Sequence, residues 1–282
     1  MVIRATMTMT ATTTMTTEAY AKVNLTLEVF GVRGDGYHAL RSLVVPVSLS
    51  DTLEIVPSAA LSSDTGYDDD LVLKAARALD PSRGAEIRVK KRIPAGGGLG
   101  GGSADAAAAL VALNDFWNLG CSRETLCEIG AQVGSDVPAL VLGGPVVMQG
   151  RGEAVERVAC PPLDLVVATP GVHTSTREVY ARCTPRDLAA PSATEACLAA
   201  LETGDLGRIA ASLVNDLALP ACRLHPEIAD ALASLRTAGA LGATVSGSGS
   251  SVFGLVESPS RAEEVAESLR KKGLSAWAVH TL

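Results

Sequence analysis

The sequence predicts an α+β protein of two lobes joined near residue 160. Two observations favour this class. Segments with strand-like alternation are interspersed with segments of helical periodicity throughout the chain. Near residues 160–162 the pattern starts afresh, and the second half then has the order strand, helices, strand, strand, helix, strand. That order fits an α+β protein better than a doubly wound sheet.

The first lobe begins with strands. Residues 19–32 alternate and are rich in β-forming side chains, so they predict a strand that is followed by a turn. Residues 42–57 predict one or two further strands. Residues 69–80 have a helical apolar face and end before Pro81, and residues 85–94 alternate again as a strand.

A glycine-rich segment follows this strand. Residues 96–102 read GGGLGGG, and residues 103–118 then have a helical pattern that is rich in alanine. Residues 122–134 predict a second helix with Ser122 as its N-cap. Residues 136–158 predict a short helix and then a hairpin.

The second lobe begins with a strand at residues 163–170. The other elements expected there are helices near 175–182, 193–203, 205–215 and 226–239, a strand–loop–strand at 243–256, a helix at 260–273 and a strand at 275–282. We see no internal repeat.

The first 17 residues differ from the rest, with eight Thr, four Met and no acidic residue. They lack the apolar stretch of a secretory signal and only partly resemble a transit peptide. We therefore predict a disordered leader over residues 1–17, with a first lobe at 18–160 and a second at 161–282.

The composition argues against several classes of protein. Apolar residues make up 47% and aromatic residues only 3%, so Ala, Val and Leu must build the core. The net charge of -7 argues against nucleic-acid binding, and no apolar run approaches the ~20 residues that span a bilayer. The six cysteines form no CxxC pair, which favours free thiols. We expect a cytoplasmic protein, either monomer or homodimer, without nucleic-acid or membrane partners.

The glycine-rich segment predicts a phosphate site. Without side chains, backbone N–H groups can approach an anion closely, and the following helix directs the positive end of its dipole to the same place. A flexible linker is the alternative, but linkers rarely join a strand to a strong helix. No Lys follows the glycines as in a Walker A loop, the GxGxxG match arises from glycine density, and protein-kinase signatures are absent.

Several polar residues are candidates for chemistry, each with a structural alternative. Lys22 and Asn24 alternate onto one strand face, which is either a polar site or a solvated face. Asp136 is either a helix N-cap or a functional carboxylate, and Ser103 is either a helix cap or a ligand.

Two further segments are ambiguous in the same way. Tyr37 and His38 lie in a turn of a chain with few aromatic residues, and such a pair is more often surface than site. Residues 245–254 form a second loop of small residues, whose alternative is a tight hairpin.

Three motifs, in order, resemble those of the GHMP kinases, a family of small-molecule kinases. They are AYAKVNLTLEVFGVRGDGYHAL, PAGGGLGGGSADAA and GATVSGSGSSVFGLV, and the match extends over residues 18–282. The resemblance implies a two-lobed fold with a ribosomal-protein-S5-like first lobe and a ferredoxin-like second lobe. KVNLTLEVFGVRGDGYH, GSDVPALVLGG and NDLALPACRLHPEI further resemble members that use ATP to phosphorylate the 2-hydroxyl of a cytidine-diphosphate-linked polyol.

The resemblance also implies the site residues. Lys22 and Asp136 would be catalytic, with Asp136 as the base that Lys22 keeps ionised, and Ser103 would contact Mg²⁺. Tyr37 and Tyr180 would cover the two faces of cytosine, and His38 would hydrogen-bond its edge. The implied ATP-binding residues are Pro94, Gly96, Gly97, Gly98, Leu99, Gly100, Gly101, Gly102, Ser103, Ala104 and Asp70. The implied substrate-binding residues are Asn24, Tyr37, His38, Tyr180, Gly247, Ser248 and Gly249.

One position departs from the family pattern. The family usually has Asn where this chain has Asp70, and an ionised carboxylate cannot donate a hydrogen bond to a purine. The alternatives are a homoserine or mevalonate kinase of the same family, or a catalytically silent relative that only binds. A Rossmann dehydrogenase is remote.

Overall fold

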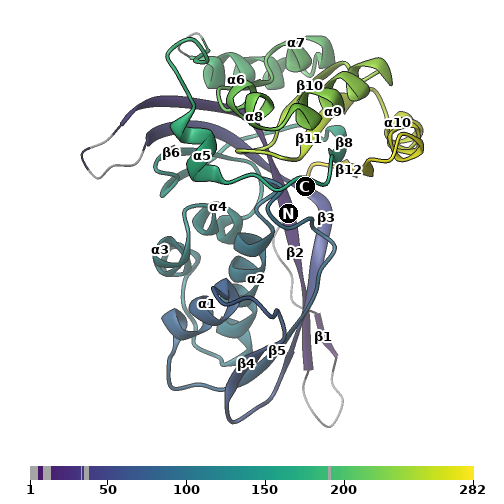
Figure 1. Ribbon diagram of the computed structural model, residues 1–282. Coiled ribbons are helices and arrows are strands. Elements are labelled where there is room, and N and C mark those ends of the chain that lie inside the picture. The colour runs from purple at the N-terminus through teal and green to yellow at the C-terminus, as the bar shows by residue number, and fades with distance from the viewer. Residues whose placement is uncertain (1–5, 9–13, 33, 35–37, 190–191) are drawn as a thin grey trace. The chain divides into compact units, whose positions relative to one another are not determined.

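The computed structural model describes residues 6–8, 14–32, 34, 38–189 and 192–282 (Figure 1). These residues form two compact units, which we describe one at a time. The first unit takes its described residues from Met1–Ala21, Leu49–Ile93 and Gly100–Gly144, and the second from Lys22–Ser48, Pro94–Leu99 and Pro145–Leu282.

The first unit contains one end of a sheet. Its strands are β1 (Thr6–Thr8), the beginning of β2 (Thr14–Val32), the end of β3 (His38–Val56), β4 (Leu61–Ser63) and β5 (Ala85–Lys90), in the order β1-β2-β3-β5-β4. β5 is antiparallel to β3 and pairs Ile87 with Ile55, while β4 is parallel to β5. Both isoleucines are fully buried, so this register directs the apolar residues into the core.

Four helices complete the first unit. They are α1 (Leu71–Leu79), α2 (Gly101–Phe116), α3 (Arg123–Val133) and α4 (Val137–Leu142). α2 is buried at every position from Ala104 to Asn114. A helix that is buried on all sides needs apolar residues around its whole circumference, and alanine lets its neighbours approach closely. The alanine run after the glycines therefore makes α2 the central helix of this unit.

The second unit continues β2 and β3 and adds the hairpin β6 (Val146–Gly150) and β7 (Ala154–Arg157). Its second sheet has β8 (Asp164–Thr169), β10 (Gly242–Val245), β11 (Val252–Val256) and β12 (Ser275–His280) in the antiparallel order β10-β11-β8-β12. This is the strand order of a ferredoxin-like fold, which confirms the expected second half.

The second unit also holds the helices α5 (Thr176–Ala181), α6 (Ala193–Thr203), α7 (Leu206–Ala211), α8 (Ala218–Leu224), α9 (Pro226–Thr237) and α10 (Pro259–Lys271) (Figure 1). Of these, α7, α9 and α10 pack against the second sheet. Buried side chains of α5, α8, α9 and α10 form one core with β8, β10 and β11, represented by Val166, Leu235 and Val245, each at 0% exposure.

Two expectations need correction. β2 begins at Thr14 rather than at residue 19, so the predicted disordered leader is wrong for residues 6–8 and 14–17, which form strands. The rest of the leader lies outside the described residues. The helix expected at 205–215 ends at Ala211, because Val214–Asn215 form the short strand β9 that pairs in parallel with β2. The lobe boundary near 160 stays a prediction, since the two compact units divide the chain differently.

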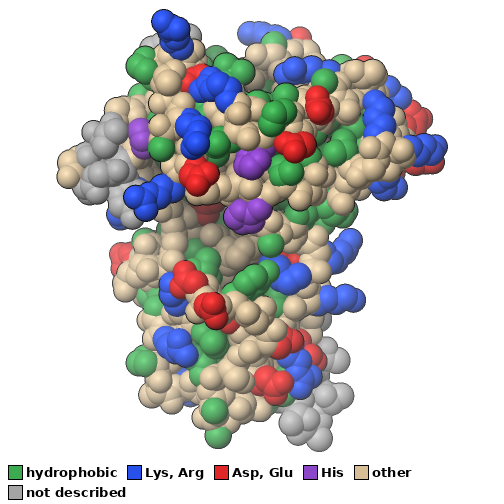
Figure 2. All heavy atoms as spheres, in the orientation of Figure 1, with side chains coloured by type: hydrophobic (Ala, Val, Ile, Leu, Met, Phe, Trp, Pro, Cys, Tyr) green, Lys and Arg blue, Asp and Glu red, His purple; other side chains and the backbone are tan. Residues whose placement is uncertain are grey.

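The surface carries charges of both signs. Figure 2 shows Lys and Arg side chains interspersed with Asp and Glu side chains over the visible faces of both units. In the part of the chain that the structure describes, no helix is long and apolar enough to cross a membrane. All six cysteines are free thiols.

Candidate active site

The glycine-rich segment adopts a conformation that few other residues could share. Gly96, Gly98 and Gly100 all have positive φ, at 65°, 74° and 70°. Gly100 is the N-cap of α2, and having no side chain it leaves the first N–H groups of the helix without a side-chain cap. These N–H groups lack partners within the helix by geometry. The start of α2 is therefore a donor site for an anion.

A second glycine loop, residues 246–251, packs against the first within the second unit. Ser246 Oγ donates to the carbonyl of Gly98 over 3.0 Å, and the N–H of Ser251 donates to the carbonyl of Gly97 over 3.0 Å. A Cβ atom on Gly98 would overlap the carbonyl oxygen of Ser246. The glycine at 98 thus allows two backbone segments to touch. Residues 245–254 do include a hairpin, in which Val245 pairs with Val252, but its loop also contacts the first glycine loop.

Lys22 lies where these two loops meet. Its N–H donates to the carbonyl of Leu99 over 3.0 Å, and a Cβ atom on Gly247 would lie 3.3 Å from Lys22 Nζ and 3.1 Å from the carbonyl oxygen of Gly98. The ammonium group therefore lies beside both glycine loops. This places a fixed positive charge next to backbone that is shaped for a phosphate.

The Lys22 side chain is oriented by a buried chain of hydrogen bonds. Lys22 Nζ donates to Asn24 Oδ1 over 2.7 Å, and Asn24 Nδ2 donates to Ser42 Oγ over 2.8 Å. Ser42 Oγ in turn donates to the carbonyl of Thr26 over 2.6 Å. Lys22 and Asn24 are each only 4% exposed, so the alternative of a solvated strand face is wrong.

The second loop is held by its own neighbours. Asn215 Nδ2 donates to the carbonyls of Val245 and Gly247 over 2.7 and 2.8 Å, which also explains why β9 replaces the expected helix end. The hydroxyls of Ser248 and Thr176 are 2.8 Å apart. Gly247 and Ser248 are thus fixed from two sides.

The predicted base-binding residues come together in part. The rings of His38 and Tyr180 stack with centroids 5.1 Å apart and an interplanar angle of 28°. His38 Nδ1 is buried and has no hydrogen-bond partner among the described residues. Tyr37 lies outside the described residues.

Asp136 and Ser103 lie in the first unit, and neither caps a helix. Asp136 occupies the N-cap position of α4, but its side chain makes no capping hydrogen bond there. Ser103 is the third residue of α2, after Gly101 and Gly102, so the capping position belongs to Gly100. The N-cap alternative is therefore right about the position of Asp136 but not about a side-chain cap, and the cap alternative for Ser103 is wrong.

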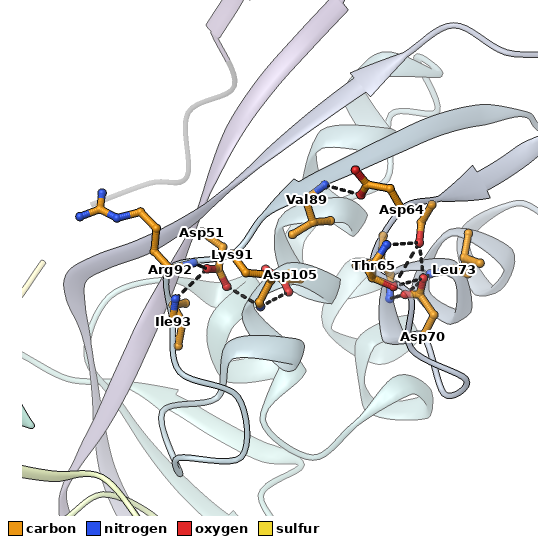
Figure 3. Close-up of polar contacts among 12 residues, drawn as sticks. Asp51, Asp64, Thr65, Asp70, Leu73, Val89, Lys91, Arg92, Ile93 and Asp105 are labelled. Carbon is orange, nitrogen blue, oxygen red and sulfur yellow. Dashed lines mark hydrogen bonds and ion pairs between the residues drawn. The ribbon is translucent and has the colours of Figure 1, made fainter. Parts of the chain in front are cut away.

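Asp70 caps α1 (Figure 3). Its Oδ1 accepts from the N–H groups of Val72 and Leu73 over 2.8 and 3.2 Å, and its Oδ2 accepts from the hydroxyls of Ser63 and Thr65. Partial burial raises the pKa of Asp70, but these hydrogen bonds outweigh it and the pKa lies below its usual value. Both carboxylate oxygens of Asp70 therefore accept hydrogen bonds from groups of the protein.

Comparisons with family models and with known proteins all indicate the same family. The family model for the GHMP kinases N terminal domain matches residues 70–144, and that for the GHMP kinases C terminal domain matches residues 197–274. A 4-diphosphocytidyl-2-C-methyl-D-erythritol kinase of Pelotomaculum thermopropionicum is 43% identical over 270 residues, covering 91% of this chain and 94% of the relative. The chain belongs to the GHMP kinases.

Solved structures of GHMP kinases agree with the fold. A crystal structure of 4-(cytidine 5'-diphospho)-2C-methyl-D-erythritol kinase matches with a TM-score of 0.84 and 38% identity, over 94% of this chain and 98% of that one. A homoserine kinase from Cytophaga hutchinsonii matches with a TM-score of 0.68 and 19% identity, over 93% of this chain and 94% of that one. The latter shows a shared fold alone.

One polar cluster of this GHMP kinase escapes sequence reasoning. Lys91 Nζ is 2.5 Å from Asp51 Oδ2 and 2.6 Å from Asp105 Oδ2, and Figure 3 shows the three side chains converging. Burial raises the pKa of Asp105 to about 7, although the contact with Lys91 opposes the shift. Two sequence features could have revealed this cluster: the acidic residue Asp105 within the alanine-rich helix, and Lys91 shortly before the glycines.

Proposed function

We propose that this GHMP kinase transfers the γ-phosphoryl group of ATP to the 2-hydroxyl of 4-diphosphocytidyl-2-C-methyl-D-erythritol. The observation that carries the phosphoryl chemistry is the Lys22 ammonium group beside the contact between Gly98 and Gly247. Similarity to the kinase of Pelotomaculum thermopropionicum over almost its whole length supports this acceptor.

The reaction needs a proton acceptor and positive groups. The hydroxyl oxygen forms a bond to the γ-phosphorus, the bond from that phosphorus to the β,γ-bridging oxygen breaks, and ADP leaves. Asp136, at the N-terminal end of α4, takes the hydroxyl proton, because transfer to a hydroxyl oxygen needs a group that accepts its proton. Lys22 offsets negative charge on the reacting oxygens, since phosphoryl transfer depends largely on positioning and electrostatic stabilisation.

The triphosphate is bound by backbone groups. The glycines at 96–98 and the first turn of α2 offer N–H donors, with Pro94 and Leu99 bounding the loop and Ala104 following it. Gly247, Ser248 and Gly249 belong to the loop of residues 246–251, which packs against Gly97 and Gly98 and so supports their conformation.

The residues at the start of α2 also fit Mg²⁺. Among the described residues, no cluster of three or more His, Cys, Asp or Glu side chains could hold a metal ion. Mg²⁺ bound with ATP takes most of its ligands from phosphate oxygens and water, so a single hydroxyl suffices. Ser103, half-buried and not used as a cap, would supply it. When bound, Mg²⁺ neutralises charge on the phosphate oxygens.

The acceptor's cytosine is recognised by aromatic and imidazole groups. Tyr180 stacks on His38, and the buried Nδ1 of His38 without a described partner supports a hydrogen bond to the base. Asn24, fixed by Ser42, lines the acceptor side near Lys22. A polar acceptor with two phosphates is in keeping with a cytoplasmic enzyme.

A coupled ADP-release assay tests the proposal. Mg-ATP is offered with the cytidylated methylerythritol, with homoserine or with mevalonate, each at the same concentration. Turnover with the cytidylated alcohol alone is the expected result. Turnover with homoserine or mevalonate alone would overturn the acceptor, and ATP binding without turnover on any of the three would indicate a silent relative.

A further inference from the structure

A cluster of three charged side chains, Asp51, Lys91 and Asp105, lies outside the groups that the proposed reaction uses. Asp51 is fully buried and Asp105 is 3% exposed, and Lys91 Nζ contacts one oxygen of each over 2.5 and 2.6 Å. Buried carboxylates of this kind are costly unless they are paired, so the lysine holds both acids in the interior.

The cluster joins the two chain segments that flank the glycines, which we call the stems. The first stem is residues 91–93, and the N–H groups of Arg92 and Ile93 both donate to Asp51 Oδ1, the latter over 2.8 Å. The second stem is the start of α2, which carries Asp105. Lys91 therefore ties the end of β3, the segment after β5 and α2 at one point (Figure 3).

The two stems also touch directly. A Cβ atom on Gly101 would lie 3.0 Å from Ile93 Cγ2 and 3.6 Å from Lys91 Nζ. The loop of residues 94–100 leaves from one stem and returns to the other. Both ends of the loop are therefore attached to segments that the cluster joins.

We propose that Lys91 is a positioning residue for the phosphate loop: by binding Asp51 and Asp105 together, it fixes the two stems and pre-organises residues 94–100 for the triphosphate. Pre-organisation favours binding because less conformational entropy is lost when the ligand arrives. This inference rests on the proposed function, since it names what holds that same ATP site in shape.

The decisive experiment compares Lys91→Met with Lys91→Arg and with Lys90→Met, a matched control at an exposed neighbouring lysine. Calorimetric titration with a non-hydrolysable ATP analogue and Mg²⁺ measures binding without any acceptor, and kcat and KM are measured for both substrates. We expect Lys91→Met to weaken analogue binding and raise KM for ATP about tenfold, with KM for the acceptor unchanged. Lys91→Arg should restore part of the affinity, and Lys90→Met should match the wild type.

The outcomes separate the inference from the function on which it rests. If Lys91→Met lowers Tm but binds the analogue as the wild type does, Lys91 is merely structural and the inference is wrong. If the wild type itself fails to bind the analogue, the proposed function fails instead. Should Lys91→Met not fold, the double variant Lys91→Met, Asp105→Asn removes the charge left buried, and the same titration applies to it; wild-type affinity in that variant would equally overturn the inference.

Discussion

The imidazole of His173 occupies the space that a side chain at Gly96 would need. A Cβ atom built on Gly96 would overlap Cδ2 and Nε2 of that ring, and Gly96 also has a φ of +65°. Glycine at position 96 thus allows a backbone conformation that other residues rarely adopt, and a side chain there would also displace the exposed imidazole of His173, a residue that follows β8.

Gly96→Ala should therefore destabilise the protein more than conformational strain alone explains. A left-handed conformation costs an L-residue about 1–2 kcal/mol, and the overlap with His173 adds to it. Gly66→Ala is the matched control, because Gly66 has a φ of +71° with nothing within 4 Å of its Cβ position. Denaturant unfolding of both variants and of Gly96→Ala, His173→Ala measures the difference.

The double variant Gly96→Ala, His173→Ala separates the effect of the imidazole on stability from that of the backbone strain. Removing the imidazole should bring the loss of stability down to that of Gly66→Ala, because only the strain in φ remains. Equal losses in Gly96→Ala and Gly66→Ala would show that the ring moves aside without cost.

Asp136→Asn should lower kcat by a factor of about 10²–10⁴, because an amide cannot accept the proton of the acceptor hydroxyl. Binding of an ATP analogue should be nearly unchanged. Glu128→Gln removes an exposed carboxylate from the neighbouring helix α3 and serves as the control. The measurement is kcat for the cytidylated alcohol under steady-state conditions. An unaltered kcat in Asp136→Asn would show that Asp136 is not the catalytic base.

The sequence predicts most of the fold because most elements depend on local pattern. The buried helix α2 follows from its alanine run, and the helix α3 begins at Ser122, whose side chain accepts from the N–H of Thr125 as expected. β9 is missed because Asn215 is held by carbonyls 30 and 32 residues further along the chain, and such partners outweigh local helix propensity.

The candidate site, like the fold, can be predicted only where a local sequence pattern reveals it. Glycine density reveals the phosphate loop, but the meeting of Gly98 with Ser246 joins residues 148 positions apart. Likewise, Lys91 and Asp51 are 40 positions apart, and a lysine between Lys90 and Arg92 has the pattern of an ordinary exposed charge. Pairings of this kind become visible only once the sheet and α2 bring the partners together.

Asp105→Asn should change how stability depends on pH. The pKa of Asp105 is raised by burial to about 7 from 3.8, so the folded protein binds this proton more tightly than the unfolded chain does. Its contribution is fully present below the unfolded value and is lost as pH rises through about 7, with a slope of at most about 1.4 kcal/mol per pH unit.

Tm of the wild type and of Asp105→Asn, measured from pH 5 to pH 8, tests this. The difference in Tm between variant and wild type should move in favour of the variant as the pH rises. Asp115→Asn, an exposed position on the same helix, controls for the loss of a negative charge. Parallel curves for wild type and Asp105→Asn would mean that Asp105 does not titrate in this range.

Asp70→Ala should destabilise the protein by more than Ser122→Ala. Loss of an N-cap typically costs about 1 kcal/mol. Ser122 caps α3 through one N–H, whereas Asp70 accepts from two N–H groups and two hydroxyls. Urea unfolding at pH 7 measures both losses, and a smaller effect at Asp70 would contradict its assignment as the anchor of α1.

Tyr180→Leu should raise KM for the cytidylated acceptor without a matching rise in KM for ATP. In the structure Tyr180 stacks on His38, with centroids 5.1 Å apart, so its ring both fixes the imidazole and offers a face to a base. Stacking of a base on an aromatic ring is worth about 1–3 kcal/mol, which corresponds to a rise in KM of roughly fivefold to about a hundredfold. Tyr180→Phe keeps the ring and should stay close to the wild type. Steady-state kinetics with each substrate varied in turn distinguishes the two cases, and an equal rise in both KM values would show that Tyr180 supports the second unit as a whole rather than the nucleoside site.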